Sequence, residues 1–290
     1  MQSLPLTKQY TRMKRRQSLS IFSLALASLL SSVALAQTKP TPPAPKTKVG
    51  GKLTNAVLFD MINKGGRLRM LSQRTAKAYA QIGLAVLPER ADKILKDSIS
   101  LFDRSLVELI ELAPTEAIKT SYLTLEKSWL SYKALLSVKP SSQAGQQIYT
   151  LSDVVLKLAN DAVELVDDFT GSKTGALVNL SGRQRMLTQR LAKKVFFREW
   201  IGLKDNVLLI TTDEKEYVTA STNLGKDRET SDRVKTDLAL AQTQWLFFQS
   251  AIQASLGSKS NMGHLTNVAN TSERMLEMYE SVTAQFQRLS

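Results

Sequence analysis

One stretch of this sequence occurs twice, 116 positions apart, and that repeat constrains the fold more than any other feature. Ile62–Lys77 reads INKGGRLRMLSQRTAK and Val178–Lys193 reads VNLSGRQRMLTQRLAK, with ten identical positions. The same offset pairs Trp129-Leu130 with Trp245-Leu246, far downstream of the stretch. Identity over that distance indicates that a whole domain was duplicated, rather than a short motif.

Apolar residues recur at helical spacing in both copies, and breaks containing Gly or Pro separate the helices. In the first copy the expected helices are residues 53–87, 89–112, 115–138 and 143–169. In the second copy the breaks fall at residues 202–205, 225–227 and 257–263. Four amphipathic helices with short connections form an up-down-up-down bundle. The expected fold is therefore all-α, with two tandem four-helix bundles related by internal duplication.

The composition of the chain changes at two further places and so predicts its domain boundaries. Residues 37–52 begin with a Pro-rich run that suits an extended linker, and the Gly-containing segment 171–175 predicts a bend between the copies. The first domain is expected over residues 53–170 and the second over residues 176–290. Near their ends, Phe169 and Phe286 align one residue beyond the common offset.

The N-terminus has the pattern of a secretory signal peptide over residues 1–36. Arg12, Lys14, Arg15 and Arg16 precede an apolar run over residues 21–30, and Ala34-Leu35-Ala36 forms a small-x-small cleavage site. Cleavage after Ala36 predicts a periplasmic or secreted product with no stable membrane span. A retained membrane anchor is the alternative, and Met13 is an alternative start.

Composition excludes several classes of function. The chain has a formal charge of +13, which becomes +8 without residues 1–36, and it contains no Cys and one His, His264. Disulfides, iron–sulfur clusters and thiolate zinc sites are therefore excluded. There is no clustered nucleophile and base and no phosphate-binding Gly-rich loop, so we expect no enzyme, no metal and no cofactor. The signature arginines lack interleaved aromatics and the protein is expected to be exported, so nucleic acid is not an expected partner.

The repeated stretch predicts a helix with partners on more than one side. On a helical wheel, one arc carries residues suited to a bundle core, with Arg69 at its edge beside Gln73. That arc consists of Leu58, Met61, Gly65, Leu68, Ser72, Ala76 and Tyr79. Arginines and apolar residues cover the remaining sides, and a solvent-facing helix would not usually be apolar or arginine-bearing all round.

Arg69 and Arg185 hold corresponding positions at the edge of this arc, and two interpretations of them stay open. Neither has a carboxylate three or four positions away, although a buried guanidinium needs an anion. In one interpretation a distant carboxylate, such as Asp103 or Glu126, forms a structural salt bridge. In the other, the guanidinium binds a small nitrate-like or carboxylate anion, because its planar fork of donors suits paired oxygens.

The signature N-x-x-G-R-x-R-M-L-[ST]-Q-R resembles the type IV pili methyl-accepting chemotaxis transducer N-terminal (PilJ-type) family, which is related to the periplasmic domains of nitrate/nitrite sensor kinases. In those kinases the stretch reads approximately N-x-A-G-S-L-R-M-Q-S-x-R, and the arginine before Met binds the anion between paired first helices. The matching residues are Asn63, Gly66, Arg69, Met70, Ser72 and Arg74 in the first copy and Asn179, Gly182, Arg185, Met186 and Arg190 in the second. This sequence departs from the kinase pattern at Arg67, Arg183, Gln73 and Gln189, which brings it closer to the pilus-receptor branch.

The resemblance implies a sensor-like, ligand-binding protein that relays to a membrane receptor or a sensor kinase. The expected ligand-binding residues are Arg69, Arg185, Arg67, Arg183, Arg74, Arg190, Asn63, Asn179, Gln73 and Gln189, and the expected helix-packing residues are Gly66, Gly182, Met70 and Met186. Because one chain carries both copies, it could form a pseudo-two-fold pair alone, with Arg69 and Arg185 facing a shared pocket. The alternative is a non-catalytic structural or interaction protein in which these arginines form buried salt bridges.

Overall fold

A computed structural model describes residues 53–257 and 261–289. The predicted signal peptide and Pro-rich linker lie outside the described residues. Residues 51–290 form one compact unit that includes both copies. In the described part of this unit, no helix is long and apolar enough to cross a membrane.

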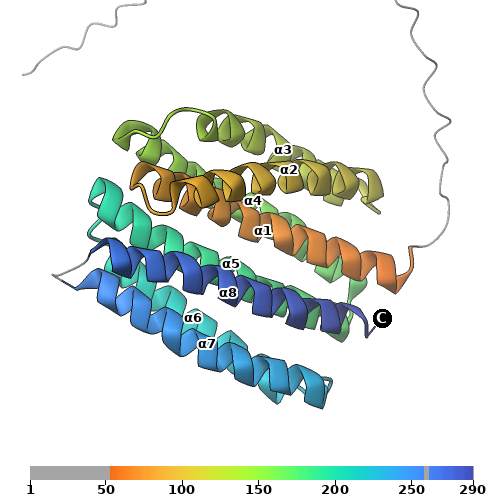
Figure 1. Cartoon of the computed structure of the whole chain (residues 1–290). Helices are drawn as coiled ribbons and strands as arrows, with labels where there is room; N and C mark the ends of the chain where they lie inside the picture. Colours follow the sequence, from red (N-terminus) through yellow and green to blue (C-terminus); the bar gives the residue numbers. More distant parts are fainter. Residues whose placement is uncertain (1–52, 258–260, 290) are drawn as a thin grey trace, which may run out of the picture. The chain divides into compact units, whose positions relative to one another are not determined.

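The described residues are helical, and eight helices follow one another along the chain (Figure 1). Their bounds are α1 Asn55–Gly83, α2 Pro88–Leu112, α3 Glu116–Leu136, α4 Ser142–Thr170, α5 Lys173–Ile201, α6 Asn206–Lys226, α7 Asp232–Leu256 and α8 Met262–Gln287. The predicted all-α class and the predicted helix breaks are therefore confirmed. Helix α5 begins at Lys173, inside the segment that the sequence assigned to the connection.

Local sequence explains where the helices begin and end. Side chains of Ser, Thr or Asn cap the N-termini of α1, α3, α4, α5, α7 and α8. At the predicted bend, Gly171 ends α4 with a φ of 56°, a left-handed conformation that glycine adopts without strain. Ser172 then accepts a hydrogen bond from the backbone N–H of Gly175 and so starts α5.

The first helices of the two copies form the centre of the molecule. In each copy the first helix packs against the second and fourth helices, and α1 also packs along the length of α5. Figure 1 shows α2 and α3 on one side of the α1–α5 pair and α6 and α7 on the other. Gly66 lies against Gly182 and Gly83 against Trp200, so α1 and α5 run in the same direction. The two copies are therefore joined side by side through their signature helices.

Equivalent contacts recur in the two copies, but the fourth helices require a different offset in residue number. Gln73 donates to the carbonyl oxygen of Ser152 at 2.8 Å, and Gln189 donates to that of Ser272 at 3.0 Å. Position 152 in α4 therefore corresponds to position 272 in α8, an offset of 120. By this offset Phe286 corresponds to Val166, and both are fully buried, whereas Phe169 is half-exposed. The predicted alignment of Phe169 with Phe286 is wrong, because α7 has 25 residues where α3 has 21, which shifts α8 by four positions.

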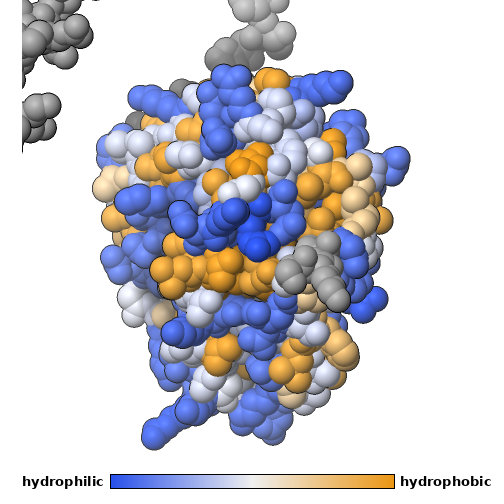
Figure 2. Space-filling view, turned by 90° about the vertical axis from the view of Figure 1, so that its left-hand side faces the viewer, coloured by the Kyte–Doolittle hydropathy of each residue, from blue (hydrophilic) through white to orange (hydrophobic). Residues whose placement is uncertain are grey.

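The core confirms the predicted inward face of the signature helix. Every residue of the predicted arc, from Leu58 to Tyr79, is buried, and so are Met70 and Leu71 on other sides of α1. Each copy also buries its repeated tryptophan: Trp129 stacks on Phe102, and Trp245 stacks on Tyr217. Figure 2, which views the bundle end-on, shows a largely hydrophilic surface crossed by an apolar band.

Candidate functional site

The signature residues of one copy bind those of the other. Arg69 Nη2 donates to the side-chain oxygen of Asn179 at 2.7 Å and to its backbone oxygen at 3.3 Å. Arg185 Nη2 donates to the same two atoms of Asn63 at 2.8 and 3.3 Å. The structure thus brings the predicted arginines and asparagines together as a reciprocal pair of clamps across the α1–α5 interface.

Gly66 and Gly182 lie against each other where α1 packs on α5 within this site. A Cβ on Gly66 would lie 3.9 Å from Cα of Gly182, 3.2 Å from Arg69 Nη2 and 3.5 Å from Arg185 Nη2. A Cβ on Gly182 would lie 3.1 Å from Arg185 Nη2. The glycines leave room for both guanidinium groups at one crossing, so Arg69 and Arg185 lie at the same place rather than at opposite ends of the molecule.

The second contact of each central arginine differs between the copies. Arg185 Nη1 donates to the carboxylate of Glu280 in α8 at 2.8 Å. Arg69 Nη1 donates to the side-chain oxygen of Asn160 in α4 at 3.1 Å. By the offset of 120, Asn160 holds the position in the first copy that Glu280 holds in the second. One half-site therefore contains its own carboxylate, and the other contains a neutral amide.

A flanking arginine repeats this difference. Arg67 donates to the Glu280 carboxylate at 3.3 Å, and Arg183 donates to the Asn160 oxygen at 3.4 Å. Glu280 thus compensates two arginines, whereas Asn160 accepts from two arginines without compensating either charge. Asn160 also donates to the Glu164 carboxylate at 2.6 Å. Asn160 therefore lies between Glu164 and Arg69 in this hydrogen-bond chain.

The charge of Arg69 is poorly compensated where it lies. Its side chain is 1% exposed, and its Nε, like that of Arg185, is buried without a hydrogen-bond partner. Burial, together with the charges of Arg183 and Arg185, lowers the pKa of Arg69 to about 9 against the opposing charge of Glu164. Burial also lowers the pKa of Arg185, but Glu280 opposes that shift. A charged group with a strongly perturbed pKa is a candidate functional group, and Arg69 meets that description better than Arg185.

The remaining signature arginines are ion-paired, as the salt-bridge interpretation predicts. The carboxylates involved are Glu280 for Arg67 and Arg185, Glu273 for Arg74, Glu216 for Arg183, and Asp213 with Glu216 for Arg190. Among the described residues, Arg69 is the one signature arginine without such a pair. The predicted partner Asp103 instead accepts from Lys133 and from Trp129, so that suggestion is wrong.

Two lysines of the repeat, Lys77 and Lys193, add a second reciprocal contact that the sequence reasoning did not assign. Lys77 in α1 is fully buried and pairs with Glu273 and the Ser272 hydroxyl of α8. Lys193 in α5 is also fully buried, and it pairs with Asp153 at 2.6 Å and the Ser152 hydroxyl of α4 at 2.9 Å. The sequence shows that both positions of the repeat are lysines. It does not show their partners, which lie on helices of the opposite copy.

The other predicted site residues serve packing. Gln73 and Gln189 each tie their first helix to the fourth helix of the same copy, and each leaves its side-chain oxygen buried without a partner. Met70 and Met186 are buried at the interface region. The two glutamines thus join α1 to α4 and α5 to α8 through equivalent hydrogen bonds.

An open pocket between α4 and α5 has Asn160 in its lining, whereas Arg69 does not line it. It has a volume of about 280 Å³ and is lined by Asp153, Leu156, Lys157, Asn160, Arg183, Met186 and Arg190. Three of these side chains are cationic and one is anionic, so the pocket provides donors for a small anion. Across the described residues, no group of His, Cys, Asp and Glu could hold a metal ion.

Comparison with known proteins gives a family match within the first copy. Residues 60–153 match the model of the family described as type IV pili methyl-accepting chemotaxis transducer N-term, abbreviated PilJ. The predicted resemblance is confirmed over this segment, which runs from the signature into α4. No curated protein and no solved structure matches the chain. The match is a similarity to a transducer segment over those residues, and the relation to nitrate/nitrite sensor kinases stays a prediction.

Proposed function

We propose that this protein is a non-catalytic, periplasmic sensor-type module that binds one small anion per chain at the Arg69 half-site and relays its binding to a membrane receptor or sensor kinase. The observation that supports the proposal is the difference between two corresponding positions, Asn160 and Glu280. Glu280 supplies Arg185 with a carboxylate, and a bound anion would supply Arg69 with the equivalent charge.

Electrostatics favours an anion at this point. A buried charge without an opposite charge is costly, and here two further guanidinium groups add repulsion to burial. An anion entering between α4 and α5 would displace the amide of Asn160 and accept from Arg69 and Arg183 together. Nitrate or a small carboxylate presents paired oxygens to such donors, and the adjoining pocket of about 280 Å³ accommodates ions of that size.

A relay can follow from the position of the site. Arg69 also clamps α1 to Asn179 of α5, so an anion that draws its guanidinium away would loosen one of the two reciprocal clamps. The expected consequence is a shift of α1 relative to α5, the two helices that join the copies. A partner that contacts both copies would sense that shift.

Thermal unfolding in the presence of anions tests the proposal. We expect nitrate, nitrite or acetate, added at constant ionic strength, to raise the melting temperature, since a ligand at 100 times its Kd stabilises the folded state by about 2.7 kcal/mol. Arg69→Gln should remove the effect. Arg104→Gln, which changes an exposed arginine of α2, should retain it.

A second variant covers the case in which Arg69→Gln fails to fold. Asn160→Glu combined with Glu164→Ala gives α4 the residues that α8 carries at Glu280 and Ala284, so Arg69 gains an internal carboxylate. This variant keeps every arginine and should no longer respond to the anion. An anion response that is unchanged in this variant would contradict the proposal.

The alternative is a structural or interaction protein in which the arginines only form salt bridges. The ion pairs of Arg67, Arg74, Arg183, Arg185 and Arg190 favour it. It predicts that no anion, nitrate, nitrite, sulfate, phosphate or acetate, raises the melting temperature at millimolar concentration. The same titration therefore separates the two functions.

A further inference from the structure

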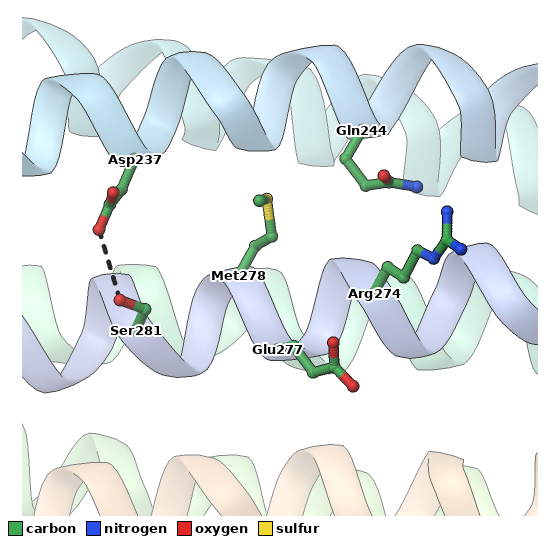
Figure 3. Close-up of a pocket in the computed structure, with 6 residues that line it drawn as sticks. All are labelled: Asp237, Gln244, Arg274, Glu277, Met278 and Ser281. Carbon is green, nitrogen blue, oxygen red and sulfur yellow. Dashed lines mark hydrogen bonds between the residues drawn. The ribbon is translucent and has the colours of Figure 1, made fainter.

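A second pocket lies in the groove between α7 and α8, away from the signature helices (Figure 3). Its volume is about 450 Å³, which falls in the range of roughly 300–1,000 Å³ typical of small-molecule sites. The lining residues are Asp237, Gln244, Arg274, Glu277, Met278 and Ser281. Charged and polar groups stand at both ends of the groove, with the Met278 side chain between them.

One end of the groove offers hydrogen-bond donors without an acceptor. Gln244 Nε2 is buried and has no partner, and a buried donor in that state costs about 1–3 kcal/mol. Arg274 is exposed and forms no hydrogen bond or ion pair with any described residue. Figure 3 shows these two side chains pointing toward each other, while Glu277 points away from the groove. An amide donor and a guanidinium that converge in this way suit a carboxylate.

The other end offers a carboxylate. Asp237 accepts from the Ser281 hydroxyl at 3.3 Å and from Gln285 at 2.6 Å, and both donors use the same oxygen, Oδ2. Its other oxygen, Oδ1, accepts no hydrogen bond from a described residue, so it can accept from an ammonium group. Asp237 and Gln244 are seven positions apart in α7, which at 1.5 Å per residue separates them by about 10 Å along the helix.

The first copy does not repeat these groups. With the offset of 116 for α3 and α7, Asp237 and Gln244 correspond to Ser121 and Ser128. With the offset of 120 for α4 and α8, Arg274 corresponds to Val154. The bundle fold is built in the first copy without charged or amide side chains at these positions, so folding does not require them in the second.

We infer that the α7–α8 groove is a binding site for a short peptide with free termini. The peptide carboxylate binds Arg274 and Gln244, its terminal ammonium binds Asp237, and its aliphatic part lies on Met278. An extended chain adds about 3.3–3.6 Å per residue, so a peptide of two or three residues spans the groove. The site does not involve Arg69 and is independent of the anion proposed there.

Isothermal titration calorimetry of the whole protein with trialanine tests the inference. We expect trialanine to bind, and both N-acetyl-trialanine and trialanine amide to bind at least tenfold more weakly, because each lacks one terminal charge. Arg274→Ala should weaken trialanine binding at least tenfold. Arg233→Ala, which removes an exposed charge of α7 outside the groove, should leave it unchanged.

Removing the negative charge of Asp237 separates a specific site from general electrostatic attraction of the peptide. In Asp237→Asn, trialanine and N-acetyl-trialanine should bind equally, because the carboxylate that selects the ammonium is gone. Two results would overturn the inference: no binding of trialanine at millimolar concentration, or equal binding by the wild type and Arg274→Ala. Arg69→Gln should keep the peptide affinity, so loss of the anion site and loss of the peptide site are distinguishable.

Discussion

The two copies have the same helices and the same signature, yet they treat their central arginines differently. In the second copy, Arg185 is neutralised by Glu280 of its own fourth helix. In the first copy, Arg69 has the amide of Asn160 at the corresponding position. The comparison teaches that two copies with the same paired geometry can differ in charge compensation through one side chain, Asn160 in the first copy and Glu280 in the second.

The carboxylates of the interface are distributed just as unequally. Asp213, Glu216, Glu273 and Glu280 of the second copy pair with signature arginines, whereas the first copy contributes Asp153, which pairs with Lys193. The positive charges of the signature helix in the first copy are therefore compensated largely by carboxylates of the second copy. The fourth helix of the first copy, α4, lies next to Arg69, the signature arginine without a carboxylate partner in the described part of the chain.

The largest expected effect concerns the buried lysines. Glu273→Gln leaves Lys77 and Arg74 without a carboxylate, and breaking a buried pair costs about 3–5 kcal/mol. Asp153→Asn, the matched change in the first copy, should cost less, because the Asp153 side chain is 46% exposed. Urea unfolding of both variants measures the difference. Equal losses would show that the two reciprocal contacts are equivalent despite their burial.

The same pair predicts an acid dependence of stability. Burial raises the pKa of the Glu273 carboxyl, but the charges and hydrogen bonds of Lys77 and Arg74 outweigh it and lower the pKa to about 2. Because the folded-state pKa is below the unfolded value, this stabilisation is present above about pH 4.5 and is lost as the pH falls toward 2, by roughly 3 kcal/mol in all. Unfolding free energies between pH 5 and 2 check it. Glu273→Gln should flatten that slope, and an unchanged slope would assign it to other carboxyls.

A smaller loss of folding stability is expected when the second copy is given the residues of the first. Glu280→Asn with Ala284→Glu removes the carboxylate beside Arg185, and hydrogen bonds to charged groups contribute about 1.5–3 kcal/mol. The variant should also bind a second anion per chain, because both half-sites then carry an amide. Urea unfolding and the stoichiometry of anion binding measure the two effects. A stoichiometry that stays at one would break the proposed equivalence of the half-sites.

The smallest effect is expected from the reverse exchange. Asn160→Glu with Glu164→Ala places a carboxylate beside Arg69 and should raise stability by about 1 kcal/mol, part of the gain being offset by desolvation of the new charge. Thermal unfolding without added anion provides the measurement. A loss of stability would mean that α4 cannot present a carboxylate to Arg69 in the way that α8 presents Glu280 to Arg185.

Much of the fold was readable from the sequence because its causes are local. Helical spacing, Gly and Pro breaks and capping side chains act within a few residues, so all eight helices could be predicted near their observed ends. The resemblance of the signature to the PilJ-type family also rests on a contiguous stretch. The alignment of Phe169 with Phe286 failed because α7 is four residues longer than α3, and the resulting shift shows only once α4 and α8 are seen in place.

The site was only half predictable, for a physical reason. The sequence by itself determined that Arg69 and Arg185 are related positions on helices with partners on several sides, and that neither has a carboxylate within reach along its own helix. Which groups meet those arginines depends on the packing of α1 against α5 and on the register of α4 and α8. Tertiary structure decided that each arginine clamps the asparagine of the other copy, and that Glu280 faces one guanidinium while Asn160 faces the other, because electrostatic compensation depends on distance in space and not along the chain.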